Sequence, residues 1–490
     1  MEQNSLKKNA FYSVLKVFLS LVFPIITFPY ASRILLPEGI GKVNFANTII
    51  SYFIMIASLG IGNYATREAA KIREDRKALS KLFKEIISIN FFCCIVAYIL
   101  FFIALNFIPK FNTYRTLLLV SSIKILFSVL GIEWIFTANE DFKYITIRTF
   151  FMQLFSLFYL FIFVHTADDI VHYVIFGLLT AVGCNVFNFF FVGKYVDLSF
   201  KTKLEIKKHF KAIIIFFGMT IVTSIYTMLD TAMLGFLSSD TEVGYYTAST
   251  KLGHMVLSML TAITAVLLPR LTNYAQKNDR SSFNELVKKS ANILLLLSIP
   301  MTCGLIILAR PLVVLLSGEQ YLPAVRSMQV ISPILIIISF GSLTGVQILP
   351  SIGKEKISFY SYIAGAVTNV ILNSILIPKY GALGAAIGTV GAESAVTSVQ
   401  LFFTRKVIIN KDLLITFMET IFASLIMIFV INIITSNMHT IILQLIVSFI
   451  TGIIIYSVIL VILRNKYFLF YKRKVLYKLS KLEKLSNVVD

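Results

Sequence analysis

Ionisable side chains lie inside several long apolar stretches of this sequence. They are Lys16, Lys124, Glu133, Asp230, Lys251, His254 and Glu393, with Arg33 and Arg270 near the ends of such stretches. A charge at bilayer depth costs roughly 2.5–3.5 kcal/mol on insertion scales, so it tends to face a cavity or a partner. Buried lysines suit an anionic ligand, and buried carboxylates suit a proton, a cation or a basic neighbour. The chemistry indicated is binding and movement of ions rather than bond making.

Lys16 has two interpretations that the sequence leaves open. It lies about six residues into the first apolar stretch, so its ammonium could snorkel to the lipid headgroups or face a cavity as the contact for an anionic substrate. Pro24 and Pro29 follow on the same stretch and remove backbone donors, which predicts a bent helix. Bent first helices line pathways more readily than straight ones.

Asp230, Lys251 and His254 form the second group of candidates. Asp230 lies deep in the seventh stretch and needs an ion pair, a proton or a coupled cation. Lys251 and His254 are three residues apart, so they share a helix face. Lys251 is a candidate partner of Asp230 or a phosphate contact, whereas His254 alone is more often a packing residue.

Glu133 and Glu393 are the remaining intramembrane carboxyl groups. Glu133 precedes Trp134 near the inner end of the fourth stretch, and the favoured interpretation is an interfacial aromatic belt with exposed charges. Glu393 lies among small residues that suit close helix packing, which predicts a hydrogen bond inside the bundle.

The elements that must position these side chains are membrane-spanning helices. The chain has 490 residues, mean hydropathy +0.83 and 57% apolar residues, and only 14% of its residues are charged. A soluble protein would carry about a quarter charged residues. Apolar runs of about 20 residues cross a bilayer, and without period-2 alternation they are helices. The sequence predicts an all-α polytopic membrane protein with about fourteen transmembrane helices. The predicted spans are 10–31, 43–65, 86–108, 116–138, 150–166, 171–193, 212–237, 244–269, 291–309, 328–350, 358–378, 384–404, 413–435 and 441–463.

Lysine and arginine alternate in density from one set of loops to the other by roughly five to one. This bias places both termini in the cytoplasm and requires an even number of crossings. The net charge of +20 then serves orientation and contact with anionic membrane lipids, and no nucleic acid is needed to explain it. Residues 472–484 carry lysines with leucines on one face, which predicts a basic helix lying on the membrane.

A weak internal repeat divides the chain. Residues 41–46 and 244–249 each begin with glycine and carry a small residue five positions later. Parallel halves of this kind are a transporter architecture, with the pathway at their interface. The predicted parts are an N-terminal lobe at 1–211, a C-terminal lobe at 212–405, an extra helix pair at 406–463 and a basic cytoplasmic tail at 464–490.

Several features that an enzyme would need do not occur in the sequence. There is no glycine-rich nucleotide loop, no metal-ligand spacing and no long outer loop for a catalytic domain. The four cysteines lie in apolar runs and are interpreted as packing residues. The chain is therefore predicted to be no enzyme and to need no cofactor or metal.

Segments spread along most of the chain carry a family resemblance. They are residues 29–41, Glu133-Trp134 with 140–146, 229–235, 243–246 with Lys251, 268–271 and 381–386. In this order they resemble the polysaccharide repeat-unit (O-antigen and capsule, Wzx-like) flippases of the MOP superfamily, which also holds lipid II flippases and MATE exporters. Leu36 departs from the family pattern, where glycine is expected between leucine and proline, and this puts the local turn geometry in question.

The resemblance implies two pseudo-symmetric six-helix lobes around a central cavity, plus two C-terminal helices. It implies flipping of undecaprenyl-pyrophosphate-linked oligosaccharide from the inner to the outer leaflet of the bacterial cytoplasmic membrane by alternating access. The expected substrate-binding residues are Lys16, Arg33, Lys251 and Arg270, and the expected gating or coupling residues are Asp230, Glu133, His254 and Glu393. A coupled proton or sodium ion is left open, as are a polysaccharide polymerase and glycosyltransferases as partners.

Two other function classes remain as alternatives. A MATE-type cation-coupled multidrug exporter would need a cavity rich in carboxylates and aromatic side chains, whereas this sequence offers lysine and arginine. A non-transporting scaffold for polysaccharide assembly enzymes would use the basic cytoplasmic loops and would tolerate loss of the intramembrane charges.

Overall fold

The computed structural model describes residues 2–200, 202–265, 267–436, 438, 440–470 and 472–473, and in this part the chain forms helices joined by turns and loops. Within these ranges nine helices are long and apolar enough to cross a membrane. Every predicted span overlaps a helix of the structure, which confirms the all-α membrane class. The predicted surface helix of residues 472–484 lies outside the described residues from 474 onward.

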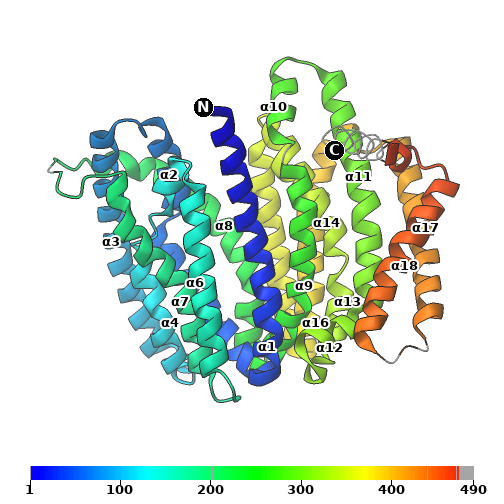
Figure 1. Ribbon diagram of the computed structural model, residues 1–490, viewed down its shortest axis with the longest axis horizontal. Helices are drawn as coiled ribbons and strands as arrows, with labels where there is room; N and C mark the ends of the chain where they lie inside the picture. The colour runs from blue at the N-terminus through cyan, green and yellow to red at the C-terminus, as the bar shows by residue number, and fades with distance from the viewer. Residues whose placement is uncertain are drawn as a thin grey trace, which may run out of the picture. The chain divides into compact units, whose positions relative to one another are not determined.

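The first of two compact units comprises Met1–Thr247 and Leu316–Gln320. Its helices are α1 (Glu2–Ser58), α2 (Ile61–Lys71), α3 (Arg76–Phe107), η1 (Pro109–Asn112), α4 (Arg115–Ser128), α5 (Glu133–Ala138), α6 (Phe142–Phe163), α7 (Ile170–Phe191), η2 (Val192–Lys194), α8 (Lys207–Leu237) and the start of α9 (Asp240–Ala265). Helix α1 packs against α3, α4 and α6, and α6 packs against α7 (Figure 1). This unit holds the site described below.

The second unit comprises Ala248–Leu315 and Tyr321–Asp490. Its elements are the rest of α9, then α10 (Leu268–Gln276), α11 (Arg280–Ile307), most of α12 (Ala309–Ser317), the end of η3 (Glu319–Tyr321), α13 (Ala324–Ile331), α14 (Ile334–Gly341), the π-helix η4 (Ser342–Ile348), α15 (Leu349–Ser351), α16 (Glu355–Ile408), α17 (Lys411–Thr435) and α18 (Ile441–Ile462). Helix α17 packs between α11 and α18, and α16 packs against α13 and α14.

Several helices begin earlier than the apolar runs predicted. Helix α6 begins at Phe142 instead of residue 150, and α11 begins at Arg280 instead of 291. Backbone hydrogen bonding continues through polar residues beyond the hydrocarbon core, and asparagine or aspartate caps mark the true starts. Asp141 and Asp279 provide such caps, because each side chain accepts a backbone N–H of the first turn. Cap residues, rather than the first apolar residue, therefore locate these helix starts.

Leu36 interrupts α1 with a backbone conformation outside the helical region, at φ 60° and ψ 173°. This region is strained for any residue with a Cβ and is populated almost only by glycine. The following Pro37 also disfavours helical geometry at residue 36. The departure from the family's glycine thus falls at a backbone bend where glycine would be the unstrained choice.

Replacing Leu36 with glycine is expected to give a protein about 1 kcal/mol more stable than replacement with alanine, because only glycine relieves the positive φ. Both variants lose the same leucine side chain, so the difference between their stabilities reports the backbone strain at residue 36. In an ordinary helix position the order is reversed by about 1 kcal/mol. Thermal unfolding of both variants in one detergent measures the difference, and equal or lower stability of Leu36→Gly would contradict the strain.

The glycines that begin the two repeated segments make reciprocal backbone contacts within the first unit. A Cβ at Gly41 would lie 1.7 Å from the carbonyl oxygen of Asp240, and a Cβ at Gly244 would lie 2.0 Å from that of Pro37. Asp240 and Pro37 each stand four residues before one of these glycines. The start of α9 and the part of α1 after its bend therefore touch main chain to main chain, which only glycine permits.

Candidate functional site

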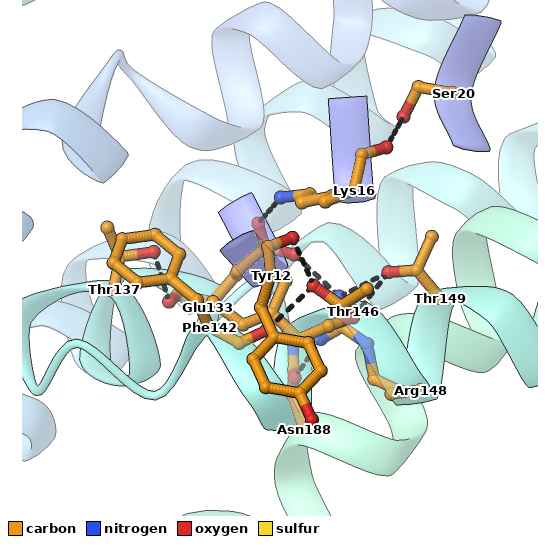
Figure 2. Close-up of polar contacts among 11 residues, drawn as sticks. Tyr12, Lys16, Ser20, Glu133, Thr137, Phe142, Thr146, Arg148, Thr149 and Asn188 are labelled. Carbon is orange, nitrogen blue, oxygen red and sulfur yellow. Dashed lines mark hydrogen bonds and ion pairs between the residues drawn. The ribbon is translucent and has the colours of Figure 1, made fainter. Parts of the chain in front are cut away.

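Four helices of the first unit bring polar side chains together at Lys16. Lys16 lies on α1, Glu133 begins α5, Arg148 lies on α6 and Asn188 lies on α7. Figure 2 shows Lys16 and Arg148 meeting at the Glu133 carboxylate, with Asn188 beside the Arg148 guanidinium. A turn at Gly131 separates α4 from α5, and it places Glu133 in the first turn of α5, where the helix dipole favours a negative charge.

One carboxylate bridges two cations. Lys16 Nζ lies 2.6 Å from Glu133 Oε1, and Arg148 Nη2 lies 2.6 Å from Glu133 Oε2. The guanidinium also donates through Nη1 to Asn188 Oδ1. The Arg148 side chain is only 3% exposed, whereas those of Lys16 and Glu133 are 33% and 37% exposed. The accessible part of the site is therefore Lys16 and Glu133, and Arg148 supports it from within.

Neighbouring hydrogen bonds hold α1 beside α6. Thr146 Oγ1 lies 2.9 Å from the carbonyl oxygen of Tyr12 and 2.8 Å from that of Phe142 (Figure 2). Because Tyr12 is one turn before Lys16 on α1, this contact fixes the α1 turn that precedes Lys16. The network thus rests on packed helices rather than on loops, which gives it a defined geometry.

Asp141 anchors the start of α6 outside the apolar spans. It accepts hydrogen bonds of 2.7 Å from Lys194 Nζ and from Tyr195 Oη. Burial raises the pKa of the Asp141 carboxyl, but the hydrogen bonds from Lys194 and Tyr195 outweigh it, so the pKa lies below its usual value. The carboxylate is therefore ionised at neutral pH and ties the start of α6 to η2 and the residue after it.

The charge of the site suits an anion. Two cations share a single carboxylate, so the cluster carries a net positive charge. Arg148 Nε and Asn188 Nδ2 are buried donors without a hydrogen-bond partner among the described residues. Buried donors without partners are costly, and a site with spare donors and excess positive charge matches phosphate or carboxylate chemistry.

Two of the expected site residues, Lys16 and Glu133, are thus brought together. The favoured interpretation of an aromatic belt is wrong for Trp134, which is only 3% exposed, while the 37% exposed carboxylate of Glu133 pairs with two cations. The sequence could not reveal this pairing, since Lys16 and Glu133 are 117 positions apart in the chain.

Arg148 and Asn188 were missed by the sequence reasoning. Arg148 falls between the predicted spans 116–138 and 150–166, but it lies inside α6 and is only 6% exposed. The helix cap at Asp141 could have revealed this, because a helix that begins at Phe142 places residue 148 in its second turn. Asn188 carried no comparable signal.

The other expected residues lie at separate positions. In the first unit, Arg33 is exposed on α1 with its Cγ 3.5 Å from a Cβ position at Gly318, and Asp230 is buried and accepts a 2.7 Å hydrogen bond from Tyr246 Oη. In the second unit, Lys251 is half-buried and His254 exposed on α9, Arg270 is exposed on α10, and Glu393 is half-buried on α16.

Comparison with known proteins places this arrangement in a family. The sequence profile described as "Polysaccharide biosynthesis protein" matches residues 6–275, and the MatE profile matches 215–375. The chain is 26% identical over 416 residues to the "Putative O-antigen transporter" of Escherichia coli (strain K12), covering 84% of this chain and 98% of that protein. It is 23% identical over 408 residues to the "Capsular polysaccharide biosynthesis protein CapF" of Staphylococcus aureus, covering 81% and 99%.

Solved structures show the same fold at low sequence identity. The "Lipid II flippase MurJ, inward closed conformation" matches with TM-score 0.75 and 19% identity, covering 93% of this chain and 99% of that chain. An inward-facing multidrug resistance MATE family transporter of the MOP superfamily matches with TM-score 0.64 and 12% identity, covering 80% and 97%. The polysaccharide profile spans more than half of the sequence and includes every residue of the Lys16 network. The chain therefore belongs to the polysaccharide biosynthesis protein family.

Proposed function

We propose that this protein flips lipid-linked oligosaccharide units across the bacterial cytoplasmic membrane, from the inner to the outer leaflet, by alternating access. Its relatives are named as an O-antigen transporter, a capsular polysaccharide biosynthesis protein and a lipid II flippase. The single observation that carries the proposal is that accessible Lys16 and buried Arg148 share only one carboxylate, that of Glu133, inside a membrane-spanning unit.

The proposed substrate is an oligosaccharide on undecaprenyl pyrophosphate. A pyrophosphate diester carries about two negative charges, and the ammonium of Lys16 is the accessible cation that can meet them. Glu133 is the partner of Lys16 in the empty protein. When substrate binds, a phosphate oxygen must take the place of the Glu133 carboxylate as the partner of the Lys16 ammonium. This exchange keeps Lys16 paired in both states and avoids leaving an isolated charge in the membrane.

Membrane potential would favour outward movement of such a substrate. The inner leaflet faces the negative side, and each elementary charge moved outward gains roughly 2.3 kcal/mol per 100 mV. The lysine and arginine bias of the loops supports cytoplasmic termini, which places Lys16 toward the inner leaflet. The proposed direction therefore runs with the electric field.

Replacing Lys16 with glutamine is expected to lower the initial rate of translocation at least tenfold, because the accessible cation is lost while the size of the side chain is nearly kept. Translocation is measured in proteoliposomes with a labelled lipid-linked oligosaccharide that becomes accessible to an outside reagent. Lys8→Gln is the matched control, since Lys8 is an exposed lysine about two turns earlier on α1. Equal rates for the two variants would exclude Lys16 as a substrate contact.

A multidrug exporter is the second candidate, and the MatE profile match to residues 215–375 favours it. The net positive charge of the Lys16 site opposes it, because cationic drugs need carboxylates. Drug susceptibility of cells that overproduce the protein separates the two functions. Increased resistance to cationic drugs, with no translocation of the labelled lipid, would replace the flippase proposal.

A further inference from the structure

Lys124 is a second intramembrane lysine of the first unit, and the Lys16 network does not include it. It lies on α4, and its Nζ donates a 2.7 Å hydrogen bond to Asn47 Oδ1 on the part of α1 that follows the bend at Leu36. The side chain is half-buried, between α4, α1 and α7. The ammonium is thus held at a defined place by a neutral amide.

No acidic side chain among the described residues lies within salt-bridge distance of Lys124. This distinguishes it from Lys16, whose charge is already shared with Glu133. An amide oxygen does not neutralise an ammonium, so the charge at Lys124 is uncompensated. Unpaired ionisable groups inside a membrane usually mark a substrate or ion pathway.

A glycine backbone lies beside the Lys124 ammonium. Gly177 of α7 faces the ammonium, and a Cβ at that position would lie 3.9 Å from Lys124 Nζ. The ammonium donates one hydrogen bond, to Asn47 Oδ1, so two of its three protons have no acceptor among the described residues. Donors without acceptors again match an anionic oxygen.

Lys124 on α4 and Glu133 at the start of α5 are nine residues apart on the same predicted span, with the turn at Gly131 between them. In the proposed topology Glu133 lies toward the cytoplasmic end of this stretch and Lys124 toward the middle of the membrane. An anion leaving Lys16 would therefore meet Lys124 next on the first unit.

We propose that Lys124, held by Asn47, is a second phosphate-contacting site that receives the anionic group of the carried lipid after it leaves Lys16. This inference rests on the proposed flippase function and deepens it. The ligand chemistry is a phosphate ester, and its source is the carried lipid rather than a phospholipid headgroup. The second site divides the passage of the anion into two shorter steps, each between positively charged groups.

Replacing Lys124 with methionine is expected to slow translocation at least tenfold and to leave binding at the Lys16 site within twofold of the unchanged protein. Binding is followed by titrating a polyprenyl diphosphate against the fluorescence of Trp134, which is the single tryptophan of the chain and adjoins Glu133. Lys16→Gln is expected to show the opposite pattern, with weakened binding. Normal translocation by Lys124→Met while Lys16→Gln is impaired would overturn this inference and leave the proposed function standing.

Chemical restoration of the charge controls for misfolding. Lys124→Cys is made in a background without the four natural cysteines, Cys93, Cys94, Cys184 and Cys303. Labelling with aminoethyl methanethiosulfonate restores an ammonium and should restore translocation, whereas the neutral methyl reagent should not. Equal rates after both reagents would overturn the proposal, and the comparison uses the same folded protein throughout.

The lipid composition of the vesicles identifies the source of the phosphate. A translocation defect of Lys124→Met in pure phosphatidylcholine vesicles supports contact with the carried lipid, because no anionic phospholipid is present. A defect that occurs only when phosphatidylglycerol is added would overturn that assignment and identify the site as a headgroup contact.

Discussion

Replacing Glu133 with glutamine is expected to destabilise the protein by about 2–4 kcal/mol, because it leaves the buried Arg148 guanidinium without a counter-charge. Removing one partner of a fully buried ion pair usually costs about 3–5 kcal/mol. The expected loss is smaller here because the Glu133 carboxylate is 37% exposed and solvent screens its contact with Lys16. Thermal unfolding in detergent, followed by the fluorescence of Trp134, measures the change beside the site.

Glu140→Gln is the matched control for this substitution. Glu140 forms a 2.8 Å salt bridge with Arg73, but the two side chains are 45% and 43% exposed. Exposed pairs of this kind contribute at most about 1 kcal/mol, so the control should unfold near the temperature of the unchanged protein. Equal losses of stability in Glu133→Gln and Glu140→Gln would contradict a buried charge network.

The double variant Glu133→Gln with Arg148→Met separates stability from transport. Removing both charges restores stability toward that of the unchanged protein, because no buried charge is left without a partner. Transport should stay impaired, since neither Glu133 nor Arg148 is left to hold the Lys16 ammonium in place. Recovery of both stability and transport would show that the network is only structural.

Replacing Gly41 with alanine is expected to prevent the reciprocal contact between α1 and the start of α9, and to lower translocation at least tenfold. The new Cβ would lie 1.7 Å from a backbone oxygen of Asp240, so the two main chains must move apart by more than 1 Å. Overpacking against side chains typically costs 1–3 kcal/mol, and backbone atoms yield less than side chains do. A transporter that must bring these segments together in one state would lose that state.

Gly62→Ala is the control for the glycine substitution. Gly62 lies on α2, and a Cβ there would meet no described atom within 4 Å. Alanine in an exposed helix position stabilises by about 1 kcal/mol, so this variant should transport normally and unfold at an equal or higher temperature. Gly244→Ala, at the reciprocal contact, should behave as Gly41→Ala does. Normal translocation by both Gly41→Ala and Gly244→Ala would refute a role in transport for the contact between α1 and the start of α9.

Hydropathy predicted the membrane helices well because burial in lipid is an additive, local property of a segment. Every predicted span overlaps a helix, although α1 and α16 each join two predicted spans across a bend at Leu36 and Gly381. The starts of α6 and α11 were placed too late, since polar caps continue a helix outside the hydrocarbon. That error assigned Arg148 to a loop and removed it from the candidate site.

The sequence by itself determined the membrane class, the helical architecture and the presence of Lys16 as a charge that needs a partner. Only the tertiary structure decided that the partner is Glu133, that Arg148 and Asn188 complete the network, and that Gly41 and Gly244 meet each other's segments. Apolar content is summed along a segment and can be read locally. Ion pairs and backbone contacts depend on how helices distant in sequence pack, and no local pattern specifies that packing.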